Sequence, residues 1–166
     1  MRFTTFTDQR ALRKAEHNET FDAFVNGIAN APEFATKTEC HWISLAVYGD
    51  TPTDKGCLRH AANLQAITGI EGDFDRGDVS IEQAAEMARA AGLKACFYTT
   101  ASHRADFYRW RVLSPLAREY PLSARGGFLD RLNGLLGGVL AGESWTPSQG
   151  FFIGRVRGVE YKCLCT

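Results

Sequence analysis

The segment that most constrains this chain is residues 66–75, Ala-Ile-Thr-Gly-Ile-Glu-Gly-Asp-Phe-Asp, in which an apolar run ends in two carboxylates. The pattern predicts a β-strand, and side chains alternate between the two faces of a strand. Asp73 and Asp75 therefore share one face, and Phe74 lies on the other. Neighbouring carboxylates repel each other, and a divalent cation such as Mg²⁺ or Mn²⁺ is a common counter-charge. The alternative is a strand that ends in an ordinary acidic turn.

The overall charge limits the classes of protein to consider. The chain has 166 residues and a formal net charge of zero. This balance argues against binding nucleic acid by bulk positive charge, although it allows a local basic groove beside an acidic site. No apolar run approaches the roughly 18 residues of a membrane-spanning helix, and no signal-peptide core opens the chain. We expect one domain in the cytoplasm, with no membrane partner.

Periodicity predicts the elements around the central strand. Before it, the sequence indicates a strand over 3–6, a helix over about 21–28 that Asn18 or Thr20 caps, and a strand over 41–48. After it, Ser80 and Gln83 form a capping box for a helix with a small apolar face. The remaining predicted elements are strands over 94–100 and 109–115, a helix over 124–136 and a last strand over 149–156.

From residue 66 onward the predicted order is β-α-β-β-α-β, which is the ferredoxin-like or RRM-like plan. In that plan two helices cover one face of a four-stranded antiparallel sheet. We therefore predict an α+β fold with an RRM-like part over 63–166, preceded by a small α/β element over 1–62. Both parts belong to one predicted domain over 1–166.

Side chains suited to phosphoryl transfer recur at the ends and faces of these predicted strands. The candidates are Asp73, Asp75, Ser102, His103, Arg109, Arg111 and Glu143. The three acids would form a cluster able to hold two cations, which suits in-line phosphoryl transfer. The histidine and the two arginines would bind a triphosphate. Each residue alone is ordinary at its position, and only their joint order favours a site.

Two further sets of residues carry weaker signals. Lys55, Arg59, Arg104 and Trp110 are candidates for contacts with a nucleic-acid strand, although exposed charge and a core tryptophan are the alternatives. Cys40, His41, Cys57 and His60 are the residue types that bind Zn²⁺. Their spacing lacks a Cys-x-x-Cys pair, and we expect no structural zinc.

The ordered motifs resemble those of the archaeo-eukaryotic primase (primase-polymerase) superfamily. The pattern there is an acid pair on a strand, a serine-containing motif that ends in histidine, and a third acid before a later strand. Similarity to the primase-like N-terminal domains of phage and plasmid replication proteins covers roughly residues 55–156. The stretches that carry it are residues 59–63, 69–75, 98–103, 109–116, 131–138 and 143–149.

The resemblance implies a template-dependent nucleotidyltransferase, a DNA primase or polymerase, that uses Mg²⁺ or Mn²⁺. Asp73, Asp75 and Glu143 would ligate the metals, and His103 would contact the nucleotide phosphates with Ser102 and the two arginines. The implied partners are nucleoside triphosphates, a single-stranded DNA template, and a helicase as a further domain or separate protein. The chain departs from the family pattern because its third acid is Glu, where Asp is more usual, and because Gln149 stands where many relatives have a basic residue.

Two other functions use the same residues. A non-catalytic RRM-like module would bind single strands or an origin through Trp110 and the arginines. A metal-dependent nuclease would use the acid pair to cut DNA. The zero net charge and the paired carboxylates argue against the binding module.

Overall fold

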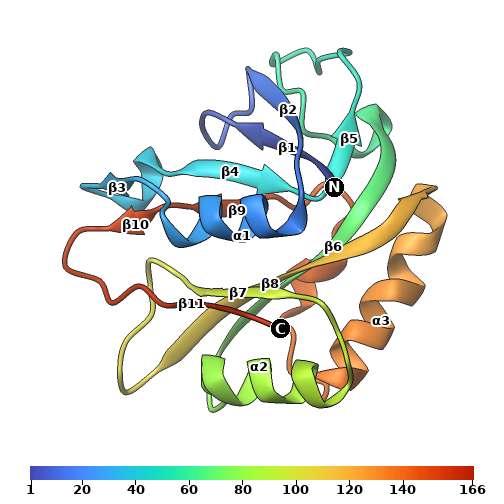
Figure 1. Ribbon diagram of the computed structural model, residues 1–166. Helices are drawn as coiled ribbons and strands as arrows, with labels where there is room; N and C mark the ends of the chain where they lie inside the picture. The colour runs from blue at the N-terminus through green and yellow to red at the C-terminus, as the bar shows by residue number, and fades with distance from the viewer.

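The computed structural model describes residues 1–166 and contains two main antiparallel sheets and three α-helices (Figure 1). The five-stranded sheet has the order β11-β7-β8-β6-β5, and its strands are β5 (Ala46–Tyr48), β6 (Leu64–Gly77), β7 (Cys96–Thr99), β8 (Tyr108–Tyr120) and β11 (Cys163–Cys165). The four-stranded sheet has the order β2-β1-β4-β9, and its strands are β1 (Arg2–Phe6), β2 (Lys14–Asn18), β4 (His41–Ser44) and β9 (Phe151–Ile153). A short parallel pair joins β3 (Glu33–Phe34) and β10 (Arg155–Val156).

The helices are α1 (Phe21–Ala29), α2 (Ile81–Ala90) and α3 (Arg125–Leu135). Four short 3₁₀ helices are η1 (Lys37–Glu39), η2 (Ala61–Asn63), η3 (Leu122–Ala124) and η4 (Gly142–Trp145). The predicted caps are present: the Thr20 hydroxyl accepts from the Ala23 N–H, and Ser80 and Gln83 form both bonds of a capping box. None of these helices has the length and hydropathy that a membrane crossing requires.

The long strands β6 and β8 form the centre of the five-stranded sheet, and alternation along them separates two environments. On one face Phe74, Phe97, Trp110 and Val112 pack against α2 and α3 in the larger apolar core. The opposite face carries Leu113, Cys96 and Tyr98, which pack against α1 and the four-stranded sheet. The five-stranded sheet is therefore covered on both sides, and the face toward β9 also carries Asp73 and Arg111.

The predicted strand over 41–48 is divided between the two sheets. β4 pairs with β1 and β9, whereas β5 pairs with β6. The break lies at Leu45, whose carbonyl accepts from the N–H groups of Thr68 and Gly69. The apolar run over these residues is continuous because both halves are buried, so no local pattern marks the change of sheet.

The last predicted strand also differs from the expected plan. The order β7-β8-β6 matches the second, third and first strands of the RRM-like plan, and α2 and α3 cover one face as expected. However, β9 pairs with β4 in the other sheet, and β5 takes the edge position beside β6. Phe151 packs with Ile43 and Leu45 there, so burial in the second core selects this partner. The fold is α+β, with this departure from the RRM-like plan.

Candidate functional site

Asp73 and Arg111 form an ion pair on the face of the central sheet that is directed toward β9. They are direct cross-strand partners on β6 and β8, and Arg111 Nε lies 2.7 Å from Asp73 Oδ1. The backbone groups of Asp73 do not bond to β8. Its N–H donates to Ser144 Oγ at 3.0 Å, and its carbonyl accepts from the Ala141 N–H at 2.8 Å. Asp73 and Arg111 are therefore a non-hydrogen-bonded strand pair, the type in which side chains approach most closely.

Arg111 is held on three sides. Its Nη1 donates to the Phe152 carbonyl at 2.9 Å, and the Tyr98 hydroxyl donates to the same carbonyl at 2.9 Å. Its guanidinium also lies over the Phe151 ring, 5.1 Å from the centroid. Burial lowers the pKa of Arg111, but Tyr98 and Asp73 outweigh it and keep the pKa above its usual value. The guanidinium is a fixed positive charge with one nitrogen, Nη2, left without a protein partner.

Lys37, which sequence reasoning did not single out, adds a second cation from η1. Its ammonium lies over the Phe152 ring, 5.0 Å from the centroid. Burial and the neighbouring charge of Arg111 lower the pKa of the Lys37 amine, and Arg109 contributes in the same direction. Arg111 and Lys37 are thus the cations whose charges act on or beside Asp73, and Arg109 acts on Lys37. No sequence signal distinguished Lys37, because residues 36–39 read as an ordinary polar connection.

Asp75 follows Asp73 by two positions on β6 and forms no ion pair or side-chain hydrogen bond in the structure. Its side chain is half-buried. Mg²⁺ is commonly bound by one or two carboxylates together with substrate phosphates, without an all-protein cage. Asp75 and the free oxygen of Asp73 fit this arrangement. The two acids therefore offer carboxylate oxygens on one strand face to a divalent cation.

The predicted cluster of three acids does not form in the structure. No group of three or more His, Cys, Asp or Glu side chains is placed to hold a metal ion. Glu143 lies on η4, where its neighbours Ala141 and Ser144 bond to the backbone of Asp73, but its own side chain is exposed. The role of Glu143 as a third metal ligand stays a prediction.

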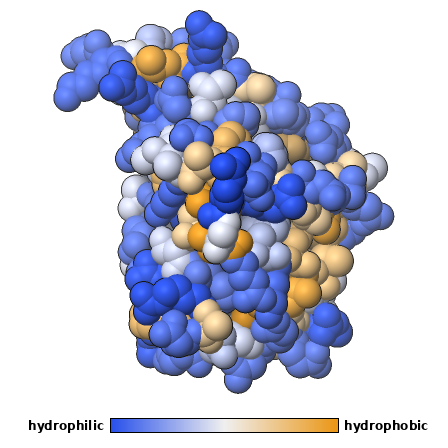
Figure 2. All heavy atoms as spheres, turned by 90° about the vertical axis from the view of Figure 1, so that its left-hand side faces the viewer, coloured by the Kyte–Doolittle hydropathy of each residue, from blue (hydrophilic) through white to orange (hydrophobic).

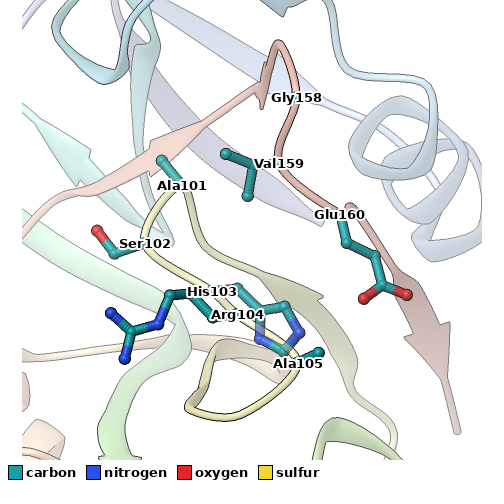
Figure 3. Close-up of a pocket in the computed structure, with 8 residues that line it drawn as sticks. All are labelled: Ala101, Ser102, His103, Arg104, Ala105, Gly158, Val159 and Glu160. Atoms are coloured by element: carbon teal, nitrogen blue, oxygen red, sulfur yellow. The ribbon is translucent and has the colours of Figure 1, made fainter.

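Ser102 and His103 lie in the loop after β7 and line a hollow of about 560 Å³ (Figure 3). The opposite wall is the segment Gly158, Val159 and Glu160, which sequence reasoning did not include. The Arg109 N–H donates to His103 Nδ1 at 3.2 Å. Because Nδ1 accepts this bond, neutral His103 carries its proton on Nε2, which is left as a donor for a ligand.

The four candidates for nucleic-acid contact have different environments. Trp110 is fully buried between Phe74 and Phe97, and its indole N–H donates to the Val79 carbonyl at 2.9 Å. The prediction that Trp110 stacks on a base is therefore wrong, because the ring completes the apolar core. Arg59 is half-buried over the Trp42 ring, whereas Lys55 and Arg104 are exposed. Arg104 is paired with Asp106 at 3.1 Å.

One solved structure is similar to this chain. No protein-family model and no curated protein matches it. Among solved structures, the AEP domain of the cyanophage S-2L primase-polymerase (PrimPol) is similar, with 14% identity and a TM-score of 0.49. The similarity covers 98% of this chain and 79% of that domain.

Proposed function

We propose that the chain is a metal-dependent nucleotidyltransferase, a DNA primase or polymerase of phage or plasmid replication. The observation that carries the proposal is the sheet face on which Asp73 and Asp75 lie beside Arg111, Arg109 and Lys37. Two carboxylates suit a divalent cation, and the surrounding cations suit the phosphates that such a cation accompanies. The order of the sequence motifs supports the same class of reaction.

In the proposed reaction a nucleoside triphosphate binds over this face, with its phosphates toward Arg111 and Arg109. Arg111 Nη2 and the Nε2–H of His103 are donors without protein partners, and Ser102 adds an exposed hydroxyl. The 3′-hydroxyl of a primer, or of an initiating nucleotide, attacks the α-phosphorus and pyrophosphate leaves. Mg²⁺ or Mn²⁺ held by Asp73 and Asp75 would supply charge neutralisation for the phosphates. The ion pair with Arg111 orients the Asp73 carboxylate.

The test is nucleotide incorporation on a single-stranded DNA template with Mg²⁺ and with Mn²⁺. We expect Asp73→Asn and Asp75→Asn each to lose at least about 100-fold in rate, because each removes charge that stabilises the transition state. Asp78→Asn is the matched control, since Asp78 is an exposed acid of the same segment and is paired with Arg76. No incorporation by the wild type with either metal, or full activity in both Asp variants, would refute the proposal.

One further variant and two assays separate the rival functions. Glu143→Gln should lose activity comparably if Glu143 acts as the third acid, whereas an unchanged rate would leave the acid pair as the whole metal site. A nuclease would cut supercoiled plasmid in Mn²⁺, and a pure binding module would retain strand affinity while incorporating nothing. Intact plasmid together with incorporation would exclude both rivals.

A further inference from the structure

Three of the five cysteines lie together at one edge of the five-stranded sheet, where β11 pairs with β7 (Figure 1). Cys165 is the cross-strand partner of Cys96, and Cys163 is the cross-strand partner of Tyr98. These side chains therefore share one face of the sheet. Cys96 also meets Cys163 along the diagonal, with 3.6 Å between the two Sγ atoms. The two thiols are in contact, and both are free.

The two thiols in contact have unequal environments. Cys96 is fully buried, whereas Cys163 is half-buried on the edge strand. The hydrogen bond with Cys96 lowers the pKa of Cys163 and outweighs the opposite effect of burial there. The same hydrogen bond, together with burial, raises the pKa of Cys96. The thiolate, which is the reactive form, is therefore favoured on the residue nearer to solvent.

The two cysteines outside this cluster lack such a partner. Cys40 is buried, its thiol donates to the Thr36 carbonyl at 3.8 Å, and burial raises its pKa. The Cys57 thiol donates to the Arg59 carbonyl at 3.5 Å. Neither forms a hydrogen bond with a second thiol. The contact between β7 and β11 thus distinguishes one pair among the five thiols.

A bond between these two thiols would tie β11 to its neighbour. β11 has three residues, lies at the edge of the sheet and has β7 as its one strand partner. The segment 158–160 leads into β11 and faces Ser102 and His103 across the hollow (Figure 3). Its present anchor is Thr99 Oγ1, which donates to the Glu160 carbonyl at 3.0 Å and accepts from the Lys162 N–H at 2.9 Å. A covalent link at the next residue would restrict β11 and this segment together.

The surface near this segment is accessible to a small water-soluble molecule. The chain between β10 and β11 lies on the left-hand side of Figure 1, and Figure 2 shows that this side is largely hydrophilic. An oxidant dissolved in water can therefore approach the strand edge that carries Cys163.

We propose that Cys96 and Cys163 are a reversible redox pair, which a hydroperoxide oxidises to a disulfide that holds β11 and the segment 158–160 against β7. The Cys163 thiolate attacks one oxygen of hydrogen peroxide, the O–O bond breaks, and hydroxide leaves and takes a proton from water. This step oxidises the Cys163 sulfur to a sulfenic acid and reduces the peroxide. The Cys96 sulfur then attacks that sulfur, an S–S bond forms, and the thiol proton leaves with the hydroxyl group as water.

The movement that this bond requires falls on β11. The sulfurs have to approach from 3.6 Å to about 2.05 Å, the length of a disulfide bond. β7 is fixed between β8 and β11, whereas β11 is free on its other edge. A dithiol such as dithiothreitol would return both thiols by exchange, supplying the two electrons and two protons.

The test treats the full chain with hydrogen peroxide, blocks the remaining thiols with N-ethylmaleimide after denaturation and identifies linked peptides by mass spectrometry. We expect the wild type to lose two of its five thiols and to link the tryptic peptides 95–104 and 163–166. Cys163 and Cys165 lie in the same peptide, so variants have to separate them. Cys165→Ser should keep the link, Cys163→Ser should lose it, and dithiothreitol should release it.

Two further variants complete the test. Cys57→Ser removes a thiol of similar burial outside the cluster and should leave the link unchanged. Cys96→Ala removes the other sulfur of the pair and should abolish the link, with circular dichroism to confirm that the variant is folded. A link that persists in Cys163→Ser, or one that is lost in Cys165→Ser, would overturn the proposal. Five free thiols in the wild type after oxidation would also overturn it.

Hydrogen exchange measures the effect of the link on β11. Oxidation should slow the exchange of amides 158–166 in the wild type and in Cys165→Ser, and dithiothreitol should reverse the change. Equal exchange in the oxidised and reduced proteins would overturn the role of the link in holding β11. None of these measurements involves nucleotide incorporation, so their outcome is independent of the proposed function.

Discussion

At the scale of single residues, Glu71 lies two positions before Asp73 on β6 and is buried, with 2% of its surface exposed. Its Oε1 accepts from the Ser44 hydroxyl at 3.0 Å and from the Leu45 N–H, and its Oε2 lies 3.5 Å from Arg125 Nη2. Burial raises the pKa of Glu71, although Arg125 and the hydrogen bonds oppose this effect. The folded protein thus favours the protonated carboxyl more than the unfolded chain does.

This shift makes stability depend on pH in a direction that can be measured. Because the pKa of Glu71 is raised on folding, the folded state binds more protons above about pH 4.5, the ordinary value, and stability falls as pH rises toward the folded pKa. The side chain of Glu71→Gln does not titrate. The free energy of unfolding of the wild type, relative to that of this variant, should therefore decrease over this pH range and become constant above it. Urea denaturation of both proteins at a series of pH values measures the difference. A difference that is constant with pH would contradict the prediction.

The sequence alone predicted the environment of some residues around the candidate site and not of others. Strand alternation correctly put Phe74 opposite Asp73, because that pattern is local. The positions of Lys37 and Glu71 in the structure depend on η1 and on the β4–β5 junction, which approach β6 and β8 from distant parts of the chain. No local pattern contains that information. Trp110 was instead predicted for the wrong environment. An aromatic residue between two arginines has the same sequence pattern on a binding surface and in a core.

At the scale of elements, β6 depends on a glycine where β4 passes into β5. A Cβ added at Gly69 would lie 2.4 Å from Leu45 Cδ1 and 2.8 Å from the Ser114 carbonyl oxygen. Both the strand partner and the change of sheet at Leu45 therefore require a residue without a side chain at this position.

We expect Gly69→Ala to destabilise the protein by about 1–3 kcal/mol, because a backbone oxygen cannot move aside as a flexible side chain could. Gly126→Ala is the matched control. Gly126 lies in α3, nothing would lie within 4 Å of its Cβ, and the change should stabilise the helix by about 0.5–1 kcal/mol. Thermal unfolding of the two variants should shift in opposite directions. A neutral Gly69→Ala would show that β4 and β5 can separate from β6 at little cost.

Helices were the elements that the sequence predicted best. The start of α2 follows from its capping box, and the extent of α3, which has no side-chain cap, follows from apolar spacing; both patterns are local. The strand over 41–48 was found, but its division was not. Its two halves are equally apolar, and only the carbonyl of Leu45, bonded to β6, marks the break.

At the scale of the whole molecule, the two predicted parts exchange strands. β5, from the first part, extends the sheet of the second, and β9, from the second part, completes the sheet of the first. Phe151 lies at the centre of this exchange, fully buried with Ile43, Leu113 and Tyr98. Strand partners at this sequence separation are set by core packing, so the fourth strand of the RRM-like plan was assigned to the wrong sheet.

Phe151→Ala should cost about 3–5 kcal/mol of unfolding free energy, since it opens a cavity between the two sheets and removes a ring against Arg111. Far-ultraviolet and near-ultraviolet melting curves should still coincide, because both sheets share this core. Val156→Ala, at a half-buried position on β10, is the milder control. Separate transitions for the two sheets in Phe151→Ala would show that the parts fold independently.

The place of β9 has a consequence for the chain as it is synthesised. β4 can pair with β1 early, because both strands have left the ribosome, but its other edge is covered only by Phe151–Ile153. Until those residues emerge, the nascent protein presents an apolar strand edge with unpaired amide and carbonyl groups, which is a template for association between copies. The interval of greatest risk of aggregation is thus set by the time that translation needs to pass from β4 to β9.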